Sequence, residues 1–289
     1  MSSDGIERRF AGAGGDPLVA TLRGEGGRPV LLLHGGGQTR HAFAHAARGL
    51  AEAGFTSVAL DQRGHGDSAR IPSGAYAFED FAADAIAVSR ALAEEHGTVP
   101  AVIGASLGGI AALLALHQAA TVFGALVLVD VTPRMDPSGV VKVQGFMRSR
   151  AAEGFASVEE AADAIAAYLP HRPRPRSLEG LAKNLRREAD GRWRWHWDPR
   201  FIEGPRSVNF DRAGVEERLL AASAALSVPA LLVRGASSEL VSEEHAAEFM
   251  ALAPDAETTD VAGARHMVAG DRNDAFSAAT LDFLKRRFR

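Results

Sequence analysis

The sequence contains no cysteine, which excludes disulfides, thiolate catalysis and cysteine-ligated zinc or iron–sulfur sites. No apolar run approaches the roughly 18 residues that a membrane helix needs, and the first ten residues lack the apolar segment of a secretory signal. Charge of neither sign dominates, because 32 Lys and Arg stand against 36 Asp and Glu, a net charge of −4. That balance gives no long-range attraction to nucleic acid or to anionic lipid. We therefore predict a cytoplasmic protein with no nucleic-acid partner and no membrane partner.

The order of apolar segments predicts an α/β fold. The 289 residues are 46% hydrophobic and 24% charged, as in one ordinary globular domain. Short runs of Val, Ile and Leu alternate with longer Ala-rich stretches of helical period, which indicates a mostly parallel sheet with helices on both faces. The expected strands are 18–23, 30–33, 56–60, 99–104, 125–129, 230–234 and 257–261, and the expected helices are 42–53, 78–96, 107–118, 242–252 and 271–287.

The alternation breaks between residues 133 and 210, where the composition turns to Arg, Pro, Trp and amphipathic helical pieces. We predict a helical cap insertion over 133–210, with 1–132 and 211–289 forming the core of the same single domain. Within the cap, His171–Arg176 alternates Arg and Pro and predicts a short extended linker.

All three tryptophans lie in the cap, between Trp193 and Trp197. Their alternation with arginine suggests a segment with one buried face and one solvent-exposed face, which favours anchoring of the cap to the core. The alternative is the wall of a substrate pocket. In that case Trp195, His196 and Phe146 are candidate substrate contacts.

Ser106 is the predicted nucleophile. An apolar strand runs into Gly104-Ala105-Ser106-Leu107-Gly108 and then directly into an Ala- and Leu-rich helix. A serine between strand and helix sits in a strained turn, and the flanking glycines remove Cβ atoms that would collide with neighbouring elements. The helix N-terminus and the Leu107 N–H can then stabilise an oxyanion beside the hydroxyl. The alternative is a serine that only caps the helix.

A glycine loop supplies a second predicted oxyanion donor. His34 and three glycines follow the strand 30–33, at the carboxyl edge where parallel sheets bind ligands. Glycine lets the backbone approach a substrate, so the Gly36 N–H is the expected donor and Gly37 lets the loop wrap around the substrate. The Lys-Ser/Thr of a phosphate-binding loop is absent. We expect His34 to brace this loop.

A third motif, Asp61-Gln-Arg-Gly-His-Gly-Asp-Ser68, suits a tight turn with internal ion pairs in which Arg63 and His65 are architectural. The order of this motif after the glycine loop and before Gly-x-Ser-x-Gly and a late histidine resembles the α/β-hydrolase superfamily, from about residue 17 to the C-terminus except for the cap. The resemblance implies the α/β-hydrolase fold and the chain order nucleophile, acid, histidine. His266 then becomes the implied base that accepts the Ser106 proton and returns it to the leaving group.

The acid has two candidates. Members of the superfamily most often carry it three or so residues past the glycine that follows the strand 230–234, where this chain has Ser238, with Glu239 one residue later. Some bacterial esterases of the superfamily carry the acid at the end of the preceding strand and have serine at the later position. Asp130 ends that strand here, so we favour Asp130 with Ser238 as its hydrogen-bond partner, and Glu239 stays the alternative. Asp130 could also simply cap a turn.

The resemblance implies a serine esterase that cleaves a small carboxylic ester, thioester or lactone through an acyl-enzyme, with no metal and no organic cofactor. The expected partner is a small-molecule acyl substrate. Two other functions stay open: carbon–carbon bond hydrolysis by the same groups, and ligand binding by an unreactive pseudo-hydrolase. Epoxide hydrolases and dehalogenases of the superfamily use an aspartate nucleophile, which Ser106 argues against. The sequence does not determine the oligomeric state.

Overall fold

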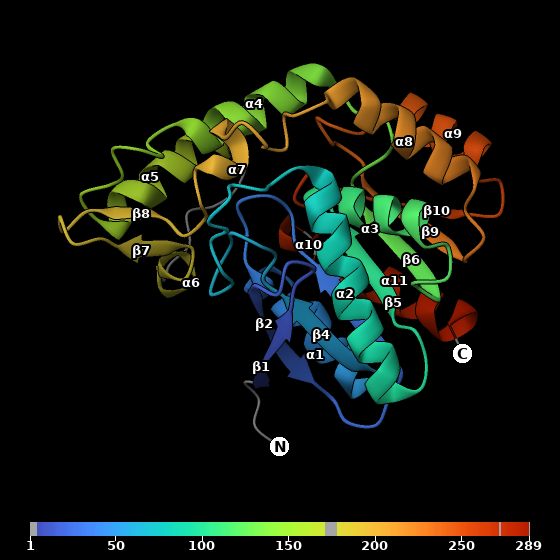
Figure 1. Cartoon of the computed structure of the whole chain (residues 1–289). Helices are drawn as coiled ribbons and strands as arrows, with labels where there is room; N and C mark the ends of the chain where they lie inside the picture. The colour runs from blue at the N-terminus through green and yellow to red at the C-terminus, as the bar shows by residue number, and fades with distance from the viewer. Residues whose placement is uncertain (1–4, 171–177, 272, 289) are drawn as a thin grey trace.

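A single eight-stranded sheet organises the computed structural model, which describes residues 5–170, 178–271 and 273–288 (Figure 1). Its strands are β1 (Ile6–Ala11), β2 (Pro17–Arg23), β3 (Pro29–Leu33), β4 (Thr56–Leu60), β5 (Ala101–Ala105), β6 (Ala125–Val129), β9 (Ala230–Gly235) and β10 (Glu257–Val261). They lie in the order β1-β2-β4-β3-β5-β6-β9-β10. Neighbours from β4 to β10 are parallel, and β1 and β2 pair in antiparallel fashion at one edge.

Helices cover both faces of this sheet, so the central strands are buried along their whole length. Leu31 and Leu33 of β3 point into the layer that holds α2, α3 and α8, whereas Val30 and Leu32 point toward α1 and α11. The elements concerned are the 3-10 helix η1 (Arg40–Phe43), α1 (Ala44–Glu52), α2 (Phe78–His96), α3 (Leu107–Gln118), α8 (Arg212–Ala224), α9 (Glu243–Leu252), α10 (Val268–Asp271) and α11 (Asn273–Arg287).

The predicted α/β architecture with a mostly parallel sheet is confirmed, and all seven expected strands are present. Three elements of the core were not predicted, and one of them is the four-residue helix α10. Strand β1 escaped notice because it is an exposed edge strand with charges at Glu7, Arg8 and Arg9, which hides the alternation that marks a half-buried strand. Helix α8 was missed although it buries Val215 and Leu219 against the core.

Between β6 and β9 the chain leaves the main sheet, and Figure 1 shows the green and yellow elements of this connection grouped outside it. They are α4 (Pro137–Arg148), α5 (Val158–Tyr168), α6 (Glu179–Ala182), β7 (Leu185–Arg187), β8 (Trp193–Trp195) and α7 (Arg200–Glu203). The expectation that strands are absent here was wrong, because β7 and β8 form an antiparallel pair. The linker predicted at 171–176 lies outside the described residues. Within the described ranges, no helix combines the length and apolar character needed to cross a membrane.

Candidate active site

Ser106 sits in the turn between β5 and α3 with φ 45° and ψ −111°. A non-glycine residue rarely adopts positive φ, and such strain collects at functional positions. Although Ser106 occupies the N-cap position of α3, its side chain makes no capping hydrogen bond. The alternative interpretation as a mere helix cap is therefore not supported, and the hydroxyl is left for another partner.

The two glycines of this turn are required by packing. A Cβ at Gly104 would lie 2.5 Å from the Gly108 carbonyl oxygen, and one at Gly108 would lie 2.1 Å from the Leu33 carbonyl oxygen. Distances below 3.0 Å are not tolerated by backbone atoms without a shift of the chain. Only glycine at both positions lets β5, α3 and β3 come together so closely.

The glycine loop after β3 lies beside the same serine, since a Cβ at Gly35 would be 3.6 Å from Ser106 Cβ. The carbonyl oxygen of Gly35 accepts the Gln38 N–H at 3.1 Å and the His34 Nδ1–H at 2.8 Å. A trans peptide is planar, so the N–H of Gly36 points away from this anchored carbonyl. Among the described residues neither the Gly36 N–H nor the Leu107 N–H has an acceptor. Both predicted donors are thus available to a ligand.

Three buried histidines brace the loop. His34 Nε2 accepts the Gln62 N–H at 3.1 Å, and His65 Nε2 accepts the Gly37 N–H at 3.1 Å while its Nδ1 donates to the Arg63 carbonyl. Desolvation by burial lowers the pKa of His34 to about 4 and that of His65 to about 3. Desolvation also lowers the pKa of His196 to about 2. The three rings are therefore uncharged at neutral pH and act as hydrogen-bond partners of the backbone.

These three pKa values predict a loss of stability in acid. The unfolded chain binds protons on these histidines below about pH 6.5, whereas the folded chain cannot, so the free energy of unfolding falls as the pH falls. Each histidine contributes a slope of about 1.4 kcal/mol per pH unit between its unfolded and folded pKa values. Chemical denaturation at pH 7.5, 6.5, 5.5 and 5.0 measures this slope, with circular dichroism verifying a native starting state. A free energy of unfolding that stays constant from pH 7.5 to pH 5.0 would contradict it.

Arg63 is architectural, as expected. Its guanidinium forms two hydrogen bonds of 2.7 and 2.6 Å with Asp84 of α2, and both side chains are buried. The turn also places Asp61 in full burial, where it pairs with Arg40 and accepts the Asp67 N–H. This ion-pair network fixes the turn after β4 against η1 and α2.

Asp130 is the carboxylate that reaches the histidine. It ends β6, is completely buried, and its Oδ2 lies 2.8 Å from His266 Nδ1. Ser238 Oγ donates to the same oxygen at 2.6 Å, and the Gly235 N–H donates to Oδ1 at 2.9 Å. Asp130 has φ 49°, so two of the four described non-glycine residues with positive φ are Ser106 and Asp130.

Glu239, the alternative acid, is engaged elsewhere. Its carboxylate accepts a hydrogen bond from Arg265 Nη1 at 2.7 Å. Partial burial opposes its ionisation, but the Arg265 guanidinium and the His266 backbone N–H lower the pKa of Glu239 overall. Glu239 therefore holds the backbone of the loop that carries His266 and does not approach the imidazole ring in the way that Asp130 does.

His266 lies in the loop after β10, and its side chain is 18% exposed. Gly235 at the end of β9 makes room for this loop, because a Cβ there would lie 2.3 Å from the Arg265 carbonyl oxygen. The sequence analysis used this glycine only to locate the acid and did not predict its packing role. Within the described residues no hydrogen bond joins Ser106 to His266. In hydrolases, the hydrogen bond between nucleophile and base often forms fully only when substrate binds.

Two of the cap candidates are packing residues. His196 is 2% exposed, and its Nδ1 and Nε2 are occupied by the backbone of Gly66 and Gly37 at 2.6 and 3.3 Å. The expectation that His196 contacts substrate is therefore corrected, since neither nitrogen is free. Trp195 is 5% exposed and stacks on Trp197 with 4.9 Å between ring centroids, so it also belongs to the packed interior.

The apolar side chains that contact the glycine loop come from other positions. A Cβ at Gly36 would lie 3.0 Å from Phe201, and one at Gly37 would lie 2.8 Å from Met147 and 3.2 Å from Trp197. Gly37 has φ 76° and is covered by these side chains. The remaining candidate, Phe146, is partly buried and stacks on Tyr168 at 4.1 Å.

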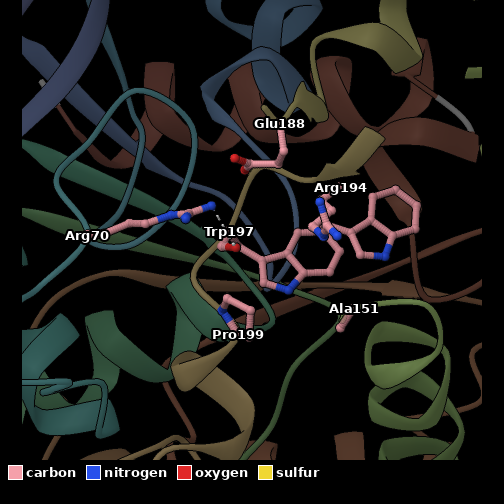
Figure 2. Close-up of a pocket in the computed structure, with 7 residues that line it drawn as sticks. Arg70, Ala151, Glu188, Arg194, Trp197 and Pro199 are labelled. Atoms are coloured by element: carbon pink, nitrogen blue, oxygen red, sulfur yellow. Dashed lines mark hydrogen bonds between the residues drawn. The ribbon is translucent and has the colours of Figure 1, made fainter. Parts of the chain in front are cut away.

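A small cavity of about 60 Å³ is lined by Trp195 and Trp197 together with residues that include Arg70 and Arg194 (Figure 2). Arg194 lines this cavity and forms two hydrogen bonds with Asp190 at 3.0 and 2.7 Å. Arg70 donates to the Trp197 carbonyl oxygen at 3.5 Å. Ser106 is not among the residues that line this cavity.

Comparison with known proteins identifies the family of this chain. The family model described as serine aminopeptidase, S33, matches residues 27–273. The chain belongs to this α/β-hydrolase family. The hydrolase is 34% identical over 254 residues to esterase Rv0045c of Mycobacterium tuberculosis, covering 84% of this chain and 76% of the relative. It is 26% identical over 251 residues to 2-(acetamidomethylene)succinate hydrolase of Mesorhizobium japonicum, covering 87% of this chain and 86% of that one.

Solved structures give the same result for the fold. The hydrolase resembles the crystal structure of E-2-(acetamidomethylene)succinate hydrolase with a TM-score of 0.81 and 25% identity, covering 97% of this chain and 99% of that one. It resembles the structure of the M. tuberculosis esterase Rv0045c with a TM-score of 0.75 and 29% identity, covering 99% and 93%. The family and the fold are therefore those that the four sequence motifs indicated.

Proposed function

We propose that this hydrolase cleaves carboxylic esters through an acyl-enzyme, with Ser106 as nucleophile, His266 as general base and acid, and Asp130 as the acid of the triad. The observation that carries the proposal is the 2.8 Å contact between Asp130 Oδ2 and His266 Nδ1 at the sheet edge where Ser106 sits in its strained turn. Its similarity to an esterase over 84% of the chain supports an ester substrate.

Asp130 sets the tautomer of His266. A carboxylate acceptor at Nδ1 places the proton of the neutral ring on that nitrogen and leaves Nε2 as the base. Nε2 accepts the Ser106 hydroxyl proton as Oγ bonds to the substrate carbonyl carbon. The buried carboxylate then stabilises the imidazolium that forms.

The Gly36 and Leu107 N–H groups bind the oxyanion of the tetrahedral intermediate. When this intermediate collapses, the carbon–oxygen bond to the alcohol breaks and His266 returns its proton to the leaving alkoxide. Water then attacks the acyl carbon while His266 accepts one of its protons. Collapse of this second intermediate breaks the bond between the acyl carbon and Ser106 Oγ, His266 returns the proton to Oγ, and the carboxylic acid product leaves. None of these steps requires a metal or an organic cofactor.

The side chains beside Gly36 suggest the kind of acyl group. Phe201 and Met147 lie against Gly36 and Gly37, and Leu107 is 3% exposed in the same apolar cluster. We infer that the acyl chain is small and apolar. Residues 133–210 then act as the cap over Ser106, and the cytoplasmic location stays a prediction.

The experiment is a panel of p-nitrophenyl esters from acetate to octanoate, run beside covalent labelling by a fluorophosphonate. We expect stoichiometric labelling at Ser106, located by peptide mass spectrometry, and hydrolysis that is fastest for short acyl chains. Prior labelling should remove all hydrolysis. Tight ligand binding with no labelling would instead identify a pseudo-hydrolase, and labelling without ester turnover would favour carbon–carbon hydrolysis.

A further inference from the structure

Gly37 follows the proposed oxyanion donor Gly36, and histidine rings hold both of its backbone polar groups. Its N–H donates to His65 Nε2 at 3.1 Å, in the turn after β4. Its carbonyl oxygen lies 3.3 Å from His196 Nε2, in the residue that follows β8. One ring belongs to the core and the other to the β6–β9 connection, so the loop is held between the two.

The second ring has a defined orientation. His196 Nδ1 accepts the Gly66 N–H at 2.6 Å, so the proton of the neutral ring lies on Nε2 and is donated to the Gly37 carbonyl. The side chain is 2% exposed, and its ring centroid is 5.8 Å from that of His65. Both ring nitrogens are therefore held by backbone groups, one in the turn after β4 and one in the glycine loop.

Gly37 needs such external anchors. Glycine has no side chain to restrict its backbone, and Gly37 has φ 76°, a conformation to which other residues are not suited. An oxyanion donor is effective when its direction is fixed before the reaction begins. The hydrogen bonds of Gly37 with His65 and His196 provide this fixation on the carboxyl side of Gly36. His34 and Gln38 do the same on its amino side.

We propose that His196 is a positioning residue that couples docking of the cap to the direction of the Gly36 N–H. The proposal rests on the proposed function, in which this N–H binds the developing oxyanion. His196 acts through the Gly37 carbonyl and does not touch the substrate. A change in the position of the cap relative to the core would thereby change the stabilisation of the transition state, while substrate binding in the ground state would stay almost the same.

Two amide substitutions separate the two contacts of the ring. His196→Asn places its amide near the position of Nδ1, so it can accept the Gly66 N–H but cannot reach the Gly37 carbonyl. His196→Gln reaches the position of Nε2 and keeps the donor to Gly37. We expect H196N to lower kcat by about tenfold or more with KM within about twofold, and H196Q to retain kcat within about threefold.

Inhibition by a trifluoromethyl ketone is a second measurement, because the adduct of this inhibitor with Ser106 places an oxyanion in the same site. A purely structural role of His196 would not change this inhibition. H196N should weaken the inhibition by the same factor as kcat, and H196Q should not. Arg186→Ala is the matched control: Arg186 Nη2 donates to the Gly66 carbonyl and has no hydrogen bond to Gly37. R186A should lower Tm and leave kcat unchanged.

Equal kcat values for H196N and H196Q would overturn the role of His196, as would a fall in kcat of more than about tenfold in folded H196Q. If H196N does not fold, the kcat of H196Q alone decides the role of His196: retention of kcat supports that role, and its loss in folded H196Q overturns it. A wild-type protein that hydrolyses no ester in the panel would instead refute the proposed function. The two failures are therefore distinguishable.

Discussion

Replacing Ser106 by alanine should reduce kcat/KM for p-nitrophenyl esters by at least about 10⁴-fold, because the residual rate then comes from the oxyanion donors and substrate binding alone. The acyl-enzyme cannot form without the Oγ atom, so fluorophosphonate labelling should disappear as well. The measurement is initial-rate kinetics over the ester panel together with intact-protein mass spectrometry. A S106A enzyme that keeps more than about one hundredth of the wild-type rate would remove Ser106 from the mechanism.

Stability separates a catalytic loss from a folding loss. Alanine keeps the Cβ atom that makes φ 45° costly, so the Tm of S106A should stay close to that of the wild type. Ser106→Gly should also be inactive, but with a higher Tm, because glycine adopts positive φ without that cost. An inactive S106A with a strongly lowered Tm would mean that the fold, and not the chemistry, was lost.

Exchanging Asp130 for asparagine should lower kcat by about 10⁴-fold, because the amide no longer selects the His266 tautomer that leaves Nε2 free as a base. The carboxylate Oδ2 that accepts His266 Nδ1–H at 2.8 Å and Ser238 Oγ–H at 2.6 Å would be replaced by a group that can donate. Rates measured from pH 5.5 to pH 9 should stay low throughout, since the defect lies in the tautomer and not in the charge of the ring.

Glu239→Gln is the matched comparison, because Glu239 is the other acid at this end of the sheet. It pairs with Arg265 and not with the imidazole, so E239Q should cost less than about tenfold in kcat. A D130N enzyme of nearly normal activity beside an inactive E239Q enzyme would reverse the assignment of the acid.

The prediction from sequence succeeded where the determinants are local. The turn around Ser106 is set by five consecutive residues between an apolar strand and an apolar helix, and the steric need for Gly104 and Gly108 follows from that connection. The strands of the parallel sheet could be predicted in the same way, since strands buried on both faces are continuous apolar runs. An exposed edge such as β1 lacks that signal.

The acid could not be decided from the chain alone because the choice depends on which strands lie side by side. Asp130 and His266 are 136 residues apart and meet because β6 pairs with β9 and β9 with β10, while Gly235 leaves room for the loop after β10. His196 is a similar case, since its partners are 130 and 159 residues away. The sequence by itself determined the nucleophile turn, the glycine loop and the fold class, because each follows from short-range sterics and periodicity. Tertiary structure alone decided which carboxylate contacts His266 and which backbone groups contact the cap histidine, because hydrogen bonds between distant segments depend on how those segments pack.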